Sequence, residues 1–175
     1  MNLIDQLHAG NTRANRDFIA DWVGRDSTRF AQLMHVYLEG EMREAQLAAG
    51  VLFCCLENHS ELFIPWLPKM VRRMDEAGVH PAVRRVVVRV LMEIDTPKQL
   101  QGRVVDLCFK YLSDPSEPIA VRVFAMGTVA HIAESEPDLW RELRQTIEMV
   151  LPYSTAAFQA HARKVFKRAR ARRSS

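Results

Sequence analysis

The sequence contains few of the residues that characterise fibrous, disulfide-rich and membrane proteins. Of its 175 residues, 7 are glycine, 8 are proline and 3 are cysteine. This composition excludes collagen-like, low-complexity and disulfide-stabilised classes. Its apolar stretches fall short of the roughly 18 residues that a membrane-spanning helix requires, so no membrane contact is expected. The first residues lack the basic and apolar regions of a signal peptide, and we therefore expect a cytoplasmic protein.

Metal ligands and catalytic residues do not occur at the spacings that their sites require. Cys54, Cys55 and Cys108 form no CxxC pair, and the 6 histidines lie singly along the chain. Zinc sites need pairs of such ligands at short spacing. The motifs of nucleotide-binding loops, serine hydrolases and metalloproteases are also missing. The sequence therefore predicts reduced cysteines, no metal and no cofactor, and it favours a binding protein over an enzyme.

Charge is divided unevenly between the body of the chain and its C-terminal end. The whole sequence has 24 basic and 21 acidic residues, a net charge of +3. Seven basic residues follow Glu148, the last acidic one, and subtracting these seven from 24 leaves 17 basic against 21 acidic residues in 1–148. A basic C-terminus is typical of proteins that bind nucleic acid or acidic surfaces. It also suits the negative end of a helix dipole, and both roles stay open.

Apolar residues recur at helical spacing, most clearly in residues 81–94. One stripe there consists of Val83, Val86, Val87, Val90, Leu91 and Ile94. These positions fall on one face of a helix, and proline at position 81 suits its first turn. Further helices are expected from about Pro65 and after Pro97, the latter with Asp95 or Thr96 as a cap. No segment alternates long enough for a strand, so the sequence predicts an all-α protein.

The helical pattern repeats with a period of about 40 residues. An apolar residue followed by arginine marks four of the expected helices: Met42-Arg43, Val83-Arg84, Val121-Arg122 and Ala162-Arg163. The marked arginines are 41, 38 and 41 residues apart. A period near 40 that contains two helices is typical of α-solenoids. A helical bundle without repeats, in which this spacing is a coincidence, is the alternative.

Three segments resemble a known repeat. Residues 80–87 (His-Pro-Ala-Val-Arg-Arg-Val-Val) and 114–125 (Asp-Pro-Ser-Glu-Pro-Ile-Ala-Val-Arg-Val-Phe-Ala) resemble the start of the second helix of HEAT repeats. Residues 64–71 (Ile-Pro-Trp-Leu-Pro-Lys-Met-Val) resemble the first helix of such a repeat. The resemblance to HEAT-like and armadillo-type proteins implies a right-handed α-α superhelix of about four helix pairs, with an N-terminal helical cap.

The resemblance also implies how the chain is divided. We expect one domain over residues 1–175. Within it, residues 1–25 are expected to form the helical cap, residues 26–170 the repeats and residues 171–175 a basic tail. Stacked helix pairs cover one another's apolar faces, and the second helices then line an extended concave surface.

This concave surface is the predicted binding site. Its candidate residues lie next to the marked arginines or one to two turns further on, on the face away from the apolar stripe: Arg85, Arg89, His131, Lys164, Arg168 and Arg172. We expect a non-catalytic scaffold that binds a protein partner there, through an acidic or extended segment. The alternatives are a DNA-binding protein that uses a basic groove with the basic C-terminus, and ordinary solvated helix faces without a binding role.

A remote resemblance to HEAT-like DNA glycosylases gives the only specific enzymatic hypothesis. Those enzymes use tryptophans and a carboxylate in a basic groove. Here Trp22, Trp66 and Trp140 fall in apolar stripes outside the second helices. The last two marked helices offer one carboxylate, Glu134, at the end of a helix. The sequence therefore does not favour this activity.

Overall fold

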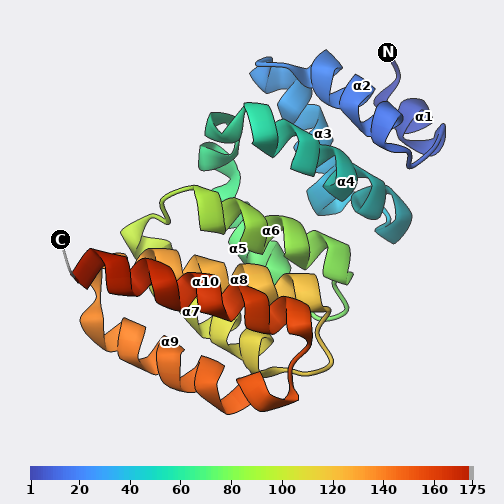
Figure 1. Cartoon of the computed structure of the whole chain (residues 1–175). Coiled ribbons are helices and arrows are strands. Elements are labelled where there is room, and N and C mark those ends of the chain that lie inside the picture. Colours follow the sequence, from blue (N-terminus) through green and yellow to red (C-terminus); the bar gives the residue numbers. More distant parts are fainter. Residues whose placement is uncertain (174–175) are drawn as a thin grey trace. The chain divides into compact units, whose positions relative to one another are not determined.

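The computed structural model describes residues 1–173, with side chains as far as residue 169, and these residues form helices joined by short connections (Figure 1). The α-helices are α1 (Leu3–His8), α2 (Arg13–Val23), α3 (Ser27–Glu39), α4 (Met42–Asn58), α5 (Leu67–Met74), α6 (Pro81–Glu93), α7 (Lys98–Ser113), α8 (Ile119–Ile132), α9 (Pro137–Val150) and α10 (Ala156–Arg173). The 3-10 helices are η1 (Ser60–Trp66), η2 (Ala133–Ser135) and η3 (Leu151–Tyr153). No strand occurs in the described range, which confirms the predicted all-α class.

The chain forms two compact units, Met1–Val90 and Leu91–Ser175. The predicted single domain, with its cap, repeats and tail, stays a prediction. Helix α10 continues to Arg173, so residues 171–173 of the expected tail are helical. The rest of that tail, residues 174–175, lies outside the described residues.

In the first unit, polar side chains at helix starts and one glycine at a helix end set the boundaries. The Asn2, Thr12 and Asp26 side chains accept hydrogen bonds from the first free backbone N–H groups of α1, α2 and α3, as N-caps do. Gly24 ends α2 with φ +49°, a conformation that L side chains rarely adopt. Residues next to the helices thus determine where α1, α2 and α3 begin and where α2 ends.

The core of the first unit lies between α3, α4 and the helices that follow. Helix α3 packs on α4, and the Phe30 ring meets the Phe63 ring edge-on with their centroids 4.9 Å apart. Tyr37 is fully buried, and its hydroxyl donates a 2.8 Å hydrogen bond to the Val83 carbonyl oxygen in α6. That bond satisfies the one polar group that Tyr37 brings into the core.

Helices α4 and α6 run side by side in the same direction. The side-chain amide nitrogen of Gln46 lies 2.8 Å from Nε2 of His80, at the start of both helices. Further along, the Arg85 guanidinium lies over the Phe53 ring, 5.1 Å from its centroid. The second contact lies further toward the C-terminus than the first in both helices, so α4 and α6 run in the same direction. Second helices of neighbouring repeats are expected to be parallel in this way.

The apolar stripe predicted over residues 81–94 is buried except at its end, where Ile94 lies just after α6 and is half-buried. Val83, Val86, Val87 and Val90 are each at most 2% exposed. Val88 lies outside the predicted stripe and is also fully buried. Helix α6 is therefore enclosed on more than one face.

In the second unit, α8 packs closely on α7 and also contacts α9 and α10. Its core includes the fully buried Leu143 and Ile147 of α9 and Phe158 of α10. The Trp140 ring of α9 meets the Phe166 ring of α10 edge-on, at a centroid distance of 6.5 Å. Aromatic and aliphatic side chains at helical spacing thus hold α9 and α10 against α8.

Two expected helix starts are wrong in detail. The helix expected from about Pro65 begins as η1, which contains Pro65, and α5 starts only at Leu67 with Pro68 in its first turn. Proline is tolerated there because the first N–H groups of a helix are unpaired anyway. Pro97 is the N-cap of α7 and no side chain bonds to its first N–H groups, so neither Asp95 nor Thr96 acts as the cap.

Candidate binding surface

Helices α8 and α10 of the second unit are parallel neighbours, and two contacts fix their register. Nη2 of Arg168 in α10 lies 3.1 Å from Oε1 of Glu134, just after α8. A Cβ at Gly127 would lie 3.6 Å from Nε2 of His161. The partners in both contacts are 34 residues apart, whereas the marked arginines of these helices are 41 apart. Equivalent residues of the two repeats are therefore staggered by 7 residues, about two helical turns.

This register brings three of the candidate residues together. His131 is four residues after Gly127, and Lys164 is three residues after His161, so both fall between the two contacts that fix the register. Together with Arg168 they form what we call the α8–α10 strip: His131, Lys164 and Arg168. The side chain of Arg172 lies outside the described residues. Whether the strip binds a ligand stays a prediction.

The α8–α10 strip is basic but partly neutralised. Lys164 is exposed, and the Arg168 side chain is 67% exposed although it pairs with Glu134. Nε2 of His131 lies 3.0 Å from Oδ1 of Asp95, whose side chain is 100% exposed. Pairs with one strongly exposed partner are weak, because water competes for that partner. The strip therefore presents cations that an acidic ligand could engage.

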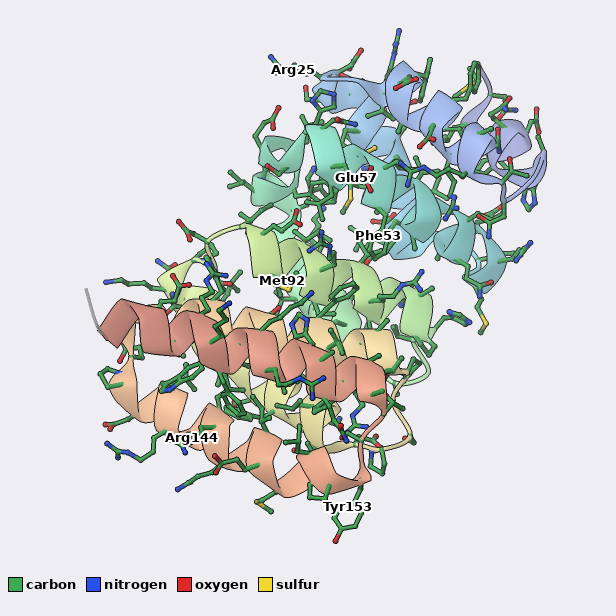
Figure 2. The ribbon with its side chains drawn as sticks, in the orientation of Figure 1. Arg25, Phe53, Glu57, Met92, Arg144 and Tyr153 are labelled. Carbon is green, nitrogen blue, oxygen red and sulfur yellow. The ribbon has the colours of Figure 1, made fainter. Side chains whose placement is uncertain are left out.

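His161 lies beneath the exposed part of the strip. The imidazole is half-buried, and its Nε2 has no hydrogen-bond partner among the residues that the structure describes. Burial lowers the pKa of His161, and the nearby charge of Lys164 lowers it further. Gly127 makes room here, because a Cβ at that position would collide with Met92 and meet His161 (Met92 is labelled in Figure 2). The glycine permits the close approach of these side chains.

The other two candidate residues belong to the first unit. Arg85 is half-buried, and its guanidinium stacks on Phe53, which is labelled in Figure 2. Arg89, one turn further along α6, is also half-buried. A cation held against an aromatic face is less available to a ligand than a solvated one. A single surface that includes all six candidates stays a prediction.

The marked arginines themselves have a structural role in the two central repeats. Nη2 of Arg84 donates a 2.8 Å hydrogen bond to the Val79 carbonyl oxygen. Nε of Arg122 donates one of 3.1 Å to the carbonyl oxygen of Leu112. The guanidinium of Arg122 also lies over the Phe158 ring, 4.9 Å from its centroid. These arginines attach the second helix of a repeat to the segment before it.

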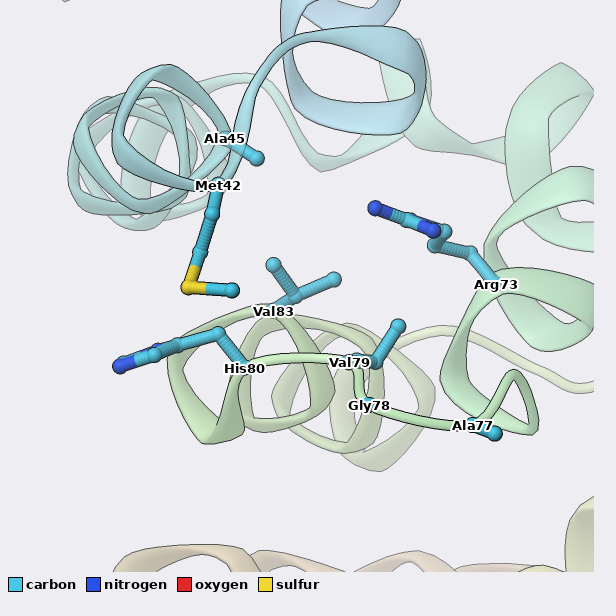
Figure 3. A pocket seen from close by; sticks show the side chains of 8 residues that line it. All are labelled: Met42, Ala45, Arg73, Ala77, Gly78, Val79, His80 and Val83. Atoms are coloured by element: carbon cyan, nitrogen blue, oxygen red, sulfur yellow. The ribbon is translucent and has the colours of Figure 1, made fainter.

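One site in the first unit was not predicted from the sequence. A pocket of about 100 Å³ lies between the first turn of α4 and the loop that leads into α6, and the Arg73 side chain enters it from α5 (Figure 3). The remaining lining residues are Met42, Ala45, Ala77, Gly78, Val79, His80 and Val83. Arg73 falls on a helix whose pattern indicated only an apolar stripe. No spacing rule could have separated it from its exposed neighbour Arg72.

The cysteine thiols are held in their protonated form. Burial raises the pKa of Cys54 to about 11 and that of Cys55 to about 12. Burial raises the pKa of Cys108 as well. All three are free and buried. Because the thiolate is the reactive form of cysteine, these side chains act as small apolar groups of the core.

None of the three tryptophans is part of the α8–α10 strip. Trp22 packs beneath the guanidinium of Arg29, and Trp66 packs beside Lys69 and the His35 ring. Trp140 and Phe166, which contact each other in the second unit, are both half-buried. No group of three potential metal ligands occurs in the described part of the chain. Likewise, none of its described helices combines the length and apolar character that crossing a membrane demands.

Pairs of helices whose second members lie parallel within each unit define an α-solenoid, a protein built from stacked helical repeats. A model of the HEAT repeat domain family matches residues 3–169 of the sequence. The chain belongs to the HEAT repeat family, as its resemblance to such repeats predicted. Comparison with curated proteins and with solved structures gave no match. HEAT repeats commonly mediate interactions between proteins.

Proposed function

We propose that this protein is a non-catalytic scaffold that binds an acidic or extended segment of a protein partner along the second helices of its repeats. The observation that carries the proposal is the α8–α10 strip, where the register of two parallel helices gathers His131, Lys164 and Arg168. Two of these side chains, His131 and Arg168, hold the carboxylates of Asp95 and Glu134 through partly exposed pairs that a ligand could replace. The cytoplasm is the expected compartment, because the buried cysteines are free.

Charge reversal in the strip tests the proposal. We would compare the wild type with the double variant Lys164→Glu/Arg168→Glu in affinity purifications from the cells of origin, quantified by mass spectrometry. The matched control is Arg141→Glu/Arg144→Glu, which makes the same charge change on the exposed face of α9. We expect one or a few proteins to be lost with the strip variant and retained with the control. Identical sets of co-purified proteins from all three would overturn the proposal.

Nucleic-acid binding is the second candidate function. It is favoured by four basic residues in six positions of α10: Arg163, Lys164, Lys167 and Arg168. The aromatic rings of this helix do not support base stacking, since Phe158 is buried and Phe166 packs on Trp140. Electrostatic binding to the duplex backbone would be the expected mode.

A salt titration separates the two functions. Binding of the full chain to duplex DNA should lose affinity steeply between about 50 and 200 mM salt if several phosphates are neutralised. We expect these four of the seven basic residues in α10 to give a shallow slope and weak affinity. Tight binding with a steep slope that Lys164→Glu/Arg168→Glu abolishes would show that the ligand of this surface is nucleic acid and not a protein.

A further inference from the structure

The pocket around Arg73 combines a cation with apolar walls. Figure 3 shows the Arg73 side chain extending from α5 toward Met42 and Ala45, above Val79 and Val83. The His80 side chain points away from Arg73 in the same view. The volume of about 100 Å³ is several times the roughly 10–15 Å³ that one water requires. The pocket is therefore large enough for a short side chain.

The electrostatics of this pocket favour an anion. Its wall includes the first turn of α4, with Met42 and Ala45, and the first turn of α6, with Val83. The partial positive charges of two helix N-termini thus meet there, and the guanidinium adds a full charge. The acidic residue in the first turn of α4, Glu44, is not among the residues that line the pocket. Its carboxylate lies 3.5 Å from Nε2 of His8 instead.

The guanidinium of Arg73 keeps donor capacity that the described residues do not fill. Its Nη1 pairs with the partly exposed carboxylate of Glu76, three residues later. Its Nε is buried and has no hydrogen-bond partner among the described residues. Burial raises the pKa of Tyr37, and the positive charge of Arg73 opposes that rise. A second carboxylate would satisfy donors that Glu76 leaves unpaired.

We propose that this pocket receives a glutamate side chain of the partner segment, with its carboxylate on Arg73 and its two methylenes against Val79, Val83 and Met42. The apolar walls argue for a side chain with an aliphatic stem rather than a free inorganic anion. Met42 is 65% exposed, so it is available to cover the stem once the side chain is in place. The inference rests on the proposed protein-binding function and names the chemistry of the partner.

The test is an NMR titration of the full chain with N-acetyl-glutamate N-methylamide. We expect saturable shifts at the amides of Gly78 and Val79 and at the methyl groups of Met42 and Ala45. The isosteric glutamine compound should bind about tenfold more weakly, because it lacks the charge. N-acetylglycine and inorganic phosphate, which carry the charge without the stem, should also bind more weakly. Equal binding of glutamine, acetylglycine or phosphate would overturn the assignment of a glutamate side chain.

Variants locate the effect. Arg73→Gln should weaken the glutamate probe about tenfold, whereas the matched change Arg72→Gln on the exposed face of α5 should leave it unchanged. Ala77→Glu places a competing carboxylate at the exposed edge of the pocket without altering the core, and it should weaken the probe as well. Unchanged binding by a folded Arg73→Gln or by Ala77→Glu would refute the site.

Failure of this inference and failure of the proposed function give different results. If the probe does not bind but co-purification still depends on Lys164 and Arg168, the pocket is refuted and the protein-binding function stands. If the probe binds but no co-purified protein depends on the strip, the pocket stands as a glutamate site and the proposed use of the strip is refuted.

Discussion

Nε of Arg122 donates a 3.1 Å hydrogen bond to the carbonyl oxygen of Leu112, ten residues earlier in the last turn of α7. The last carbonyl groups of a helix have no partner within the helix, so this bond satisfies one of them. Arg122 is 8% exposed and its guanidinium covers the Phe158 ring. One side chain thus connects three helices of the second unit: α7, α8 and α10.

Replacing Arg122 should therefore destabilise the protein. We expect Arg122→Met to lower the free energy of unfolding by about 2 kcal/mol, because it leaves the Leu112 carbonyl without its charged donor. Arg163→Met makes the same change at the equivalent, exposed position of the last repeat and should stay within about 0.5 kcal/mol of the wild type. Urea denaturation followed by circular dichroism measures both. Equal stability of the two variants would contradict this role of Arg122.

Two glycines should respond to alanine in opposite directions. Gly102 lies exposed in α7, and a Cβ added there would meet nothing within 4 Å, so Gly102→Ala should stabilise by about 0.5–1 kcal/mol through helix propensity. A Cβ at Gly40 would lie 2.5 Å from the backbone oxygen of Val36. Gly40→Ala should destabilise by about 1–3 kcal/mol, since backbone must shift. Thermal unfolding of the pair checks the prediction, which fails if both changes have the same sign.

The native thiols should resist alkylation. At pH 7.5 a thiol with a pKa of about 11, as for Cys54, is less than roughly 0.1% ionised, and burial also blocks access. We expect iodoacetamide to modify none of the three cysteines within about an hour in buffer, and all three in guanidinium chloride at about 6 M. Intact-mass spectrometry counts the adducts. Rapid modification of Cys54 or Cys55 in the folded protein would show that α4 opens readily.

Acidification should destabilise the protein in part through His161. The pKa of this group is lower in the folded chain than its ordinary value of 6.5, because burial disfavours the imidazolium. As pH falls below about 6.5, the unfolded chain takes up the proton first, and the stability that neutral His161 provides is lost. Above that pH both states are neutral and the effect is absent.

The His161→Gln variant isolates this contribution. It should reduce the decrease in melting temperature between about pH 7.5 and about pH 5.5 relative to the wild type. His35→Gln alters an exposed histidine that faces Glu39, and its melting temperature should depend on pH as that of the wild type does. A wild-type slope in His161→Gln would contradict the role assigned to its burial.

The sequence predicted the elements better than the site. Helical periodicity and caps such as Thr12 and Asp26 act over a few residues, so they were readable before the structure was known. The period between Arg84 and Arg122 indicated the repeat. It did not reveal the stagger between α8 and α10, because that stagger depends on the absence of a side chain at Gly127 and on how neighbouring helices pack.

The marked arginines show why site prediction was harder. Arg84 and Arg122 look like surface cations in the sequence, but each donates to a backbone carbonyl oxygen. Arg85 was expected to face a ligand, and its guanidinium rests on Phe53. Arg73 gave no signal at all, since its pocket arises where α4, α5 and the loop before α6 meet. Partners distant in the chain decide the role of each cation.

Most close packing within each unit joins helices that follow one another in the chain, such as α3 with α4 and α7 with α8. The helices that pack against each other are therefore joined by short loops, and the entropic cost of closing these loops is small. Proteins dominated by such local contacts reach the native state quickly. We therefore expect one helix pair to form first and the next pair to condense on it, so that folding proceeds stepwise along the chain.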